Sequence, residues 1–261
     1  MNIKDEFVSK LVESVKIAGD MVASRFNDAH TVKHKGTVDL VTEVDLASEK
    51  MLKEELSKRF PNIQFHGEEG GGADWKNSEA WVVDPIDGTT NFANRIPHFA
   101  ISVALVRKGE PLAGVVHNPI TKETFYAWKN GGAYLNGELI HVNEVTNLDD
   151  ALAVTGFPYN RRERMEEILK RLKAFLMVCA DVRRFGSASL DLCYTAKGIY
   201  SIYWEQNLKP WDIAAGSLIL QEAGGKVSKF NGEKLELDCL ELLATNGFMH
   251  EKSIELLAPT L

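Results

Sequence analysis

The chain has 261 residues and a net charge of −7, with 44% hydrophobic and 26% charged residues. This composition is typical of a globular protein with one large domain, or two that share a core. The acidic balance argues against nucleic acid as the main partner, because binding to phosphate backbones needs basic surfaces. It does not exclude a phosphorylated small molecule, since bound metal ions can reverse the local charge.

The cysteines predict a reducing compartment. Cys179, Cys193 and Cys239 are odd in number, lie far apart and form no C-x-x-C motif, so we expect free thiols in a cytoplasmic protein. Charged residues begin at Lys4, and no signal peptide is expected. The sequence has no apolar run of about 18 residues, so no membrane-spanning helix is expected.

The first third of the chain predicts two helices. Apolar residues recur at steps of three and four, which predicts a helix over 3–26 and another over about 42–60. We expect the second helix to bury Leu46, Met51, Leu52, Leu56 and Phe60. Residues 27–36 are predicted as a loop, and 63–66 as a strand.

A series of strands follows. The strands are predicted at 80–83, 99–107, 112–117, 123–128, 133–135 and 138–142. Asn136-Gly137 between the last two is a strong hairpin signal. This pattern indicates an antiparallel sheet in the N-terminal half, with the two helices on one face.

Strands and helices alternate in the second half. Strands are predicted at 151–155, 177–182, 199–204, 226–229 and 242–244, and helices at 161–175, 187–196, 212–223 and 250–257. Such alternation predicts a mixed sheet. We therefore divide the chain into an N-terminal α+β part, residues 1–147, and a C-terminal α/β part, residues 148–261.

The stretch from Trp81 to Phe92, WVVDPIDGTTNF, is the most informative motif. Its apolar first half predicts a buried strand, which we expect to stop at Asp84-Pro85 because proline has no N–H to donate. Asp84 and Asp87 can then converge around a tight turn, followed by Gly88 and a short helical turn over 90–94. This order suits a divalent cation beside backbone amides that bind phosphate. A capped turn with solvated acids is the alternative.

Other acids stand at the ends of predicted strands and the starts of helices, namely Asp39, Asp45, Glu68, Glu69 and Asp212. Capping alone explains Asp212 well, but the ends of several elements can also meet at one crevice. The histidines lack zinc-ligand spacing, and no G-x-S-x-G or P-loop motif is present. An all-oxygen ligand set suits Mg²⁺, with Mn²⁺ as a possible substitute, and hydrolysis by metal-assisted water.

These motifs resemble the inositol monophosphatase family of Mg²⁺-dependent, lithium-sensitive phosphatases. The resemblance rests on Gly67-Glu68-Glu69, on the stretch from Trp81 to Phe92, and on the stretch from Trp211 to Gly216 with Glu222 to Gly225. The stretches from Val38 to Asp45 and from Arg184 to Leu192 add to it, so that it covers nearly the whole chain. It implies a layered αβαβα sandwich of α+β and α/β character, and a homodimer.

The resemblance also implies a ligand set for two or three Mg²⁺ ions. Glu68, Asp84 and the carbonyl of Ile86 would hold the first ion, and Asp84, Asp87 and Asp212 the second. Glu68 would also help to hold a weaker third ion, near a loop that contains Lys35 and Asp39. Glu69 matches a motif position and is the less certain ligand.

The catalytic and substrate residues follow from the same resemblance. Thr89, paired with Asp45, would orient the attacking water, with Glu68 as a further catalytic residue. The N–H groups of Gly88 and Thr89 would bind phosphate. The substrate's hydroxyl groups would meet Gly186, Ser187, Ala188 and Glu205.

The implied substrate is myo-inositol 1-phosphate, with fructose 1,6-bisphosphate, another sugar phosphate or histidinol phosphate as alternatives. The reading Asp87-Gly-Thr-Thr-Asn-Phe92 favours inositol or sugar phosphates over phosphoadenosine nucleotides. Some bacterial relatives act in transcription antitermination, so association with RNA polymerase is a second hypothesis. Its candidate surface consists of Arg161, Arg162, Arg164, Arg183 and Arg184. A solvated helix face is the favoured alternative for the first three, and a dimer contact or the rim of the site is the favoured one for Arg183 and Arg184.

Overall fold

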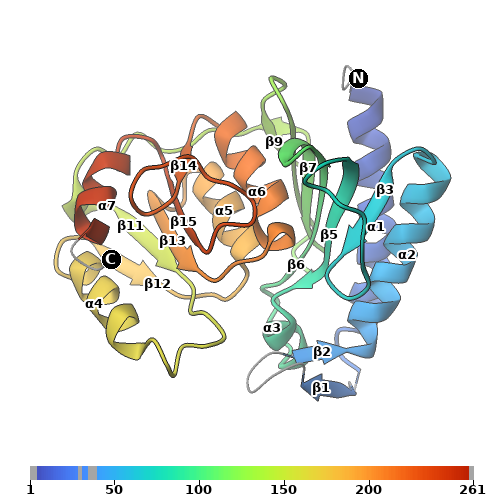
Figure 1. Cartoon of the computed structure of the whole chain (residues 1–261), viewed down its shortest axis with the longest axis horizontal. Helices are drawn as coiled ribbons and strands as arrows, with labels where there is room; N and C mark the ends of the chain where they lie inside the picture. The colour runs from blue at the N-terminus through green and yellow to red at the C-terminus, as the bar shows by residue number, and fades with distance from the viewer. Residues whose placement is uncertain (1–4, 29–30, 35–39, 259–261) are drawn as a thin grey trace.

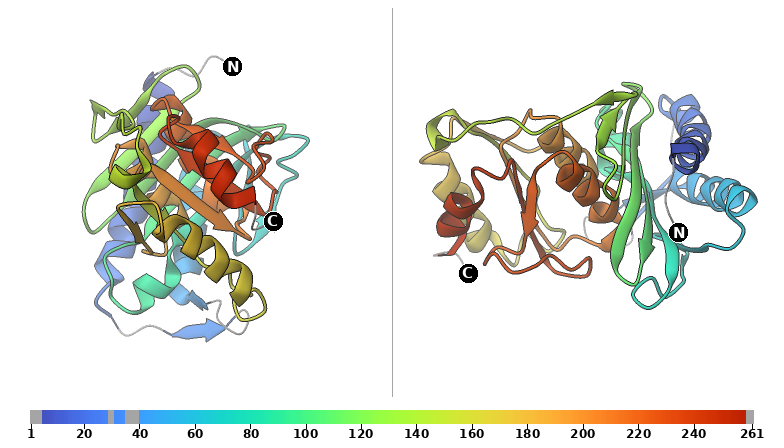
Figure 2. Two further views of the ribbon diagram at one scale, coloured as in Figure 1. Left: turned by 90° about the vertical axis from the view of Figure 1, so that its left-hand side faces the viewer. Right: turned by 90° about the horizontal axis from the view of Figure 1, so that it is seen from above.

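The computed structural model describes residues 5–28, 31–34 and 40–258, and its elements form five layers (Figure 1). Helices α1 (Asp5–Arg25) and α2 (Glu43–Arg59) cover the outer face of the first sheet. Helices α5 (Ala188–Ala196) and α6 (Pro210–Glu222) lie between the two sheets, and α4 (Met165–Leu176) and α7 (His250–Leu257) cover the second (Figure 2). The predicted αβαβα sandwich is confirmed.

The first sheet has eight strands in the order β10-β9-β8-β7-β6-β5-β3-β4. Their bounds are β3 Gln64–Gly67, β4 Gly71–Gly72, β5 Glu79–Asp87, β6 Ala100–Arg107, β7 Glu110–Asn118, β8 Glu123–Trp128, β9 Ala133–Leu135 and β10 Glu138–Leu139. The sheet is antiparallel as predicted except for β3 and β5, which are parallel. The chain leaves β3, turns back through β4, and enters β5 in its original direction.

The second sheet is mixed, as predicted. Its order is β12-β11-β13-β15-β14, with parallel pairs on both sides of β11 and antiparallel pairs on both sides of β15. The bounds are β11 Leu152–Thr155, β12 Asp181–Arg183, β13 Ile202–Gln206, β14 Lys226–Ser228 and β15 Glu241–Thr245.

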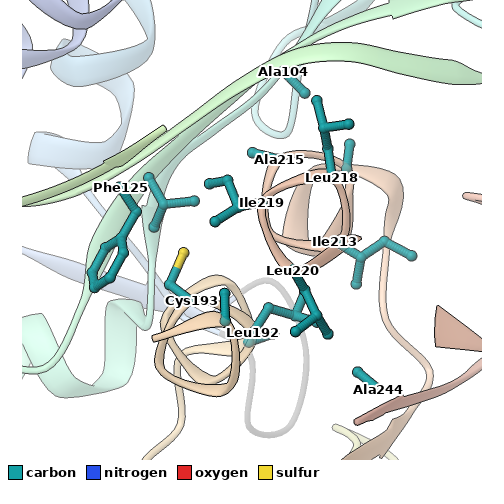
Figure 3. Close-up of a cluster of buried hydrophobic side chains, with 14 of the residues drawn as sticks. Ala104, Phe125, Leu192, Cys193, Ile213, Ala215, Leu218, Ile219, Leu220 and Ala244 are labelled. Carbon is teal, nitrogen blue, oxygen red and sulfur yellow. The ribbon is translucent and has the colours of Figure 1, made fainter. Parts of the chain in front are cut away.

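Helix α6 is the centre of the main hydrophobic core. Its residues Ile213, Ala215, Leu218, Ile219 and Leu220 project to different sides (Figure 3). The same core includes Ala104 and Phe125 of the first sheet and Ala244 of the second. A helix that is apolar on all sides must be buried. Because one core joins both sheets, the boundary at residues 147 and 148 stays a prediction.

Leu52, Leu56 and Phe60 are buried as predicted and Met51 is partly buried against the same core, but the prediction for Leu46 was wrong. Leu46 is 53% exposed, whereas Val44 and the polar Asp45 and Ser48 are buried. The apolar pattern gave the wrong prediction for Leu46 because two inward-facing positions at the start of the helix, Asp45 and Ser48, carry polar side chains. Thr42 caps this helix, and its side chain accepts hydrogen bonds from the amides of Val44 and Asp45.

Three short stretches also differ from the prediction. The predicted loop 27–36 contains β1 (Val32–His34), which pairs with β2 (Leu40–Thr42). Strands of three residues are too short for a periodic signal. Helix α4 begins at Met165 instead of 161 and runs to Leu176, which delays β12 from 177 to Asp181. Among the residues that the structure describes, no helix has the length and apolar character that a membrane crossing needs.

Candidate active site

A β-bulge in the central strand places Asp84 and Asp87. Strand β5 pairs with β6 as far as Asp84 opposite Ser102, and pairing resumes at Asp87 opposite Ala100. The prediction that the strand stops at Asp84-Pro85 was therefore wrong, because the bulge accommodates Pro85, which has no N–H. The Asp84 carboxylate accepts a hydrogen bond from the amide of Ile86 at 2.9 Å. Bulges re-aim side chains in this way beside active sites.

A third carboxylate comes from the other half of the chain. Asp212 lies in the first turn of α6, where it accepts a hydrogen bond from the amide of Lys209 at 2.7 Å. One oxygen each of Asp84, Asp87 and Asp212 lie within 4.8 Å of one another. The structure thus brings together acids that are more than a hundred residues apart in sequence. Helix capping and convergence with the other acids were alternatives for Asp212, and the structure shows both.

These acids line a pocket of about 630 Å³. Its wall also contains most of the other predicted site residues, namely Glu68, Ile86, Gly88, Thr89, Gly186, Ala188 and Glu205. Lys35 and Asp39 lie outside the described residues. In the part of the chain that the structure describes, the residues that line this pocket include Glu68 but not the neighbouring Glu69.

Helix α5 holds Asp87 in place. The Asp87 carboxylate accepts hydrogen bonds from the Ser187 hydroxyl at 2.7 Å, the Ser189 amide at 2.7 Å and the Ser189 hydroxyl at 2.5 Å. The amide of Ala188 adds a longer contact of 3.3 Å. Ser187, expected on the pocket wall, is thus buried beneath it and supports Asp87.

Thr89, Asp45 and Thr42 form a chain of hydroxyl and carboxylate groups. The Thr89 hydroxyl lies 3.1 Å from Asp45 Oδ1 and 3.0 Å from the carbonyl oxygen of Ile86. Thr42 donates its own hydroxyl and its amide to Asp45 Oδ2. Asp45 is fully buried, so its contact with solvent runs through Thr89, which is partly exposed.

Glu205 is the second-last residue of β13. It accepts a hydrogen bond from the Tyr203 hydroxyl at 2.7 Å, and its carboxylate lies against Gly156. A methyl group at residue 156 would come within 2.0 Å of that carboxylate, so glycine is needed there. Glu205 and Asp212 line the same pocket.

Comparisons with known proteins identify the chain's relatives. The sequence model of the Inositol monophosphatase family matches residues 4–260. The Caulobacter vibrioides inositol-1-monophosphatase is 39% identical over 253 residues, which cover 94% of this chain and 98% of that protein. The Vibrio cholerae Nus factor SuhB is 39% identical over 224 residues, or 85% of this chain and 84% of that one.

A solved structure agrees. The extragenic suppressor protein suhB from Bartonella henselae superposes with a TM-score of 0.92 at 34% identity, over 97% of this chain and 98% of that one. The chain belongs to the inositol monophosphatase family. The resemblance that the motifs indicated is therefore confirmed over the whole length.

The buried acids of this inositol monophosphatase family member resist ionisation. Burial raises the pKa of Asp84 well above its usual range, and the charges of Glu68, Asp87 and Asp212 raise it further. Burial and Asp87 raise the pKa of Asp212 in the same way. Burial also raises the pKa of Asp45 to about 6 and that of Glu205 to about 7. Without a cation, these acids therefore keep their protons to a higher pH than solvent-exposed carboxylic acids do.

The donor set fits hard divalent cations. Three carboxylates converge within 4.8 Å, and Glu68 and Ile86 line the same pocket. Among the described residues, no histidine or cysteine joins this cluster. Oxygen donors of this kind suit Mg²⁺ or Mn²⁺ rather than zinc. A bound cation would also offset the repulsion that raises the Asp84 pKa.

The sequence interpretation missed several supporting residues. Ser189, Thr42 and Glu49 bind site segments directly, and Asn91 donates to the carbonyls of His98 and Phe185. The sequence indicated these supporting residues only indirectly. The signals were two serines close together at residues 187 and 189, and polar residues at helical spacing between Thr42 and Glu49.

The five arginines have different surroundings. Arg161 and Arg162 precede α4 instead of lying on it, and Arg161 lines the pocket. Arg164 pairs with Glu167, and Arg183 pairs with Asp181. Arg184 stacks over Phe157 at the pocket rim. The hypothesis of a solvated helix face for the first three was therefore wrong in its placement.

Repulsion in the site predicts that Asp84→Asn stabilises the metal-free protein. Asparagine keeps the shape and can still accept from the Ile86 amide, but it removes one of the mutually repelling charges. In EDTA at pH 8, we expect the variant to melt at a higher temperature than the wild type. Mg²⁺ should then raise the wild-type melting temperature by more than that of the variant.

The same site predicts a pH dependence. Because the folded-state pKa values of these acids are raised, the native state holds more protons than the unfolded chain, and stability falls as pH rises through those values. We expect the metal-free wild type to melt lower at pH 8.5 than at pH 7, with a smaller change in Asp84→Asn. Below about pH 6.5, buried His98, His117 and His250, whose pKa values are lowered to about 4, oppose this trend. A flat or rising wild-type profile between pH 7 and 8.5 would contradict the assignment.

Proposed function

We propose that this protein is a Mg²⁺-dependent phosphatase that hydrolyses a phosphate monoester of a small polyol. The observation that carries the proposal is the convergence of Asp84, Asp87 and Asp212 within 4.8 Å at the wall of a pocket. Membership of the inositol monophosphatase family supports the reaction class. The name of the Caulobacter vibrioides relative supports myo-inositol 1-phosphate as the substrate.

The ligands that we propose are those implied by the family motifs. Glu68, Asp84 and the Ile86 carbonyl would hold one Mg²⁺, and Asp84, Asp87 and Asp212 another, with a third ion near Glu68. Bound cations would neutralise the phosphate dianion and lower the pKa of water. Helix α5 keeps Asp87 aimed at the cluster through its serine hydroxyls and amides.

Thr89 and Asp45 would remove the proton of the attacking water. The Thr89 oxygen accepts that proton while its own hydroxyl proton passes to Asp45 Oδ1, 3.1 Å away. Burial raises the pKa of Asp45 to about 6. A base with a pKa near the working pH combines a useful ionised fraction with useful basicity. The N–H groups of Gly88 and Thr89 would meet the phosphate oxygens.

The opposite wall would select the alcohol. Gly186, Ala188 and Glu205 line it, and a carboxylate at Glu205 can accept hydrogen bonds from neighbouring hydroxyl groups. This chemistry suits inositol 1-phosphate. Fructose 1,6-bisphosphate, other sugar phosphates and histidinol phosphate are the competing substrates.

Lithium inhibition, a homodimer and a cytoplasmic location are further proposals from the family resemblance. A role in transcription is the second candidate function, supported by the name of the Vibrio cholerae relative, Nus factor SuhB. Co-purification of RNA polymerase with an Asp84→Asn variant would favour that role, and would show that it does not need catalysis.

We expect phosphate release from inositol 1-phosphate to require Mg²⁺ and to stop in EDTA. The assay should include fructose 1,6-bisphosphate, histidinol phosphate and phosphoadenosine phosphate as competitors. Asp84→Asn should lower turnover at least about 10²-fold, the usual scale for losing one preorganised electrostatic group. Undiminished activity in EDTA, with no metal found in the protein, would overturn the proposal.

Thr89→Ala should lower turnover more than it changes the Mg²⁺ requirement. The hydroxyl acts on the transferred proton, so we expect a loss of about 10²-fold or more at saturating Mg²⁺. Thr121→Ala, on an exposed turn, is the matched control and should behave as the wild type. If Thr89→Ala only raises the Mg²⁺ requirement, Thr89 supports a ligand instead.

Glu205→Gln should separate recognition of the alcohol from the chemistry. We expect a higher KM for inositol 1-phosphate, and little change with an aryl phosphate that lacks vicinal hydroxyls. The two substrates are compared on the same preparation at saturating Mg²⁺. Equal losses on both substrates would place Glu205 in the metal site or the fold, and no loss on either would place it outside the recognition site.

A further inference from the structure

A buried carboxylate on α2 binds the loop that carries Glu68. Glu49 lies one helical turn after Asp45 and is buried. Its Oε2 accepts a hydrogen bond from the amide of Glu69 at 2.8 Å, and its Oε1 accepts one from the amide of Gly70 at 2.8 Å. Both carboxylate oxygens thus bind the two residues that directly follow Glu68.

The loop is shaped around this carboxylate. A methyl group at Gly67 would come 2.2 Å from Glu49 Oε2 and 2.9 Å from the Phe65 ring. A methyl group at Gly70 would come 2.8 Å from Glu49 Oε1. Glycine at both positions lets the charged group approach the backbone. In the Gly67-Glu68 motif, Glu68 supplies the acid, and Gly67 leaves the space that the Glu49 carboxylate occupies.

The other side of Glu68 is also fixed. Its amide donates to the carbonyl of Val83 at 3.0 Å, where β3 runs beside β5. The charge of Glu68 is the largest electrostatic contribution, after burial, to the raised pKa of Asp84. Like charges push these two side chains apart, so the loop must be restrained for Glu68 to stay near Asp84.

We propose that Glu49 is a positioning residue that holds Glu68 against this repulsion and thereby sets the affinity of the site for Mg²⁺. The inference rests on the proposed function, because it assumes that Glu68 and Asp84 share a cation. A buried carboxylate is costly to desolvate, and two backbone N–H donors compensate it. Groups that orient the direct ligands of a metal commonly change its affinity when they are removed.

Glu49→Gln tests the proposal with little change in volume. The amide offers one oxygen, and its NH₂ group faces a backbone N–H, so one hydrogen bond to the loop is lost. We expect the dissociation constant for Mg²⁺, measured by titration calorimetry on the EDTA-treated, dialysed protein, to rise roughly 10-fold or more. Turnover at saturating Mg²⁺ should stay within about a factor of three.

Three measurements separate positioning from a general loss of stability. Glu54→Gln, on the same helix and 68% exposed, should bind Mg²⁺ as the wild type does. In a double-mutant cycle, Glu49→Gln should add less than about a factor of two once Glu68→Gln is present, because its effect runs through Glu68. Hydrogen exchange should rise in a peptide covering residues 67–72 and stay unchanged in α6.

Gly67→Ala disturbs the same contact from the loop side, because the added methyl group would displace the Glu49 carboxylate while its charge is kept. It should weaken Mg²⁺ binding in the same direction, and it replaces Glu49→Gln if that variant does not fold. Wild-type Mg²⁺ affinity in the folded Glu49→Gln variant, or an equal cost with and without Glu68→Gln, would overturn the inference. A wild type that binds no Mg²⁺ would overturn the proposed function as well, so the two failures are distinguishable.

Discussion

Repulsion between carboxylates that the fold brings to one point is the constraint on which the site depends. Asp84, Asp87 and Asp212 lie within 4.8 Å of one another, and burial together with their mutual charges raises the pKa values of Asp84 and Asp212 well above the usual range. Such an arrangement costs free energy unless protons or cations neutralise it. The surrounding contacts are therefore best understood as restraints on groups that would otherwise separate.

Each restraint comes from a different part of the fold. The bulge of β5 directs Asp84 and Asp87, while the serines of α5 bind Asp87. Asp212 is fixed by the first turn of α6, whose apolar sides anchor it between the two sheets (Figure 3). The packing of α6 therefore also determines the geometry of the acids, because a shift of α6 would move the Asp212 carboxylate.

Much of this could be predicted from the sequence. The strand from Trp81 and the helix after Trp211 carry strong apolar signals, and the family motifs identify the acids beside them. The sequence could not show the bulge at Pro85, because strand pairing across a proline depends on the neighbouring strand. Apolar periodicity correctly identified Leu52 and Leu56 as inward-facing residues of α2, but it also included Leu46. The sequence did not show that the polar Asp45 and Ser48 face inward at the start of this helix. The hydrogen bonds that Ser189 donates to Asp87 and that Glu49 accepts from Glu69 span 102 and 20 residues, and no local pattern encodes them.

Titration calorimetry with Mg²⁺ tests the central claim most directly when it is performed at pH 7 in two buffers of different ionisation enthalpy. The difference between the two heats gives the number of protons that leave the protein on binding. Because burial and mutual repulsion raise the pKa values of the acids in the metal-free site and a bound cation would lower them again, we predict saturable Mg²⁺ binding with net proton release, and a smaller release in Asp84→Asn. Binding without proton release, or no binding at all, would contradict the account.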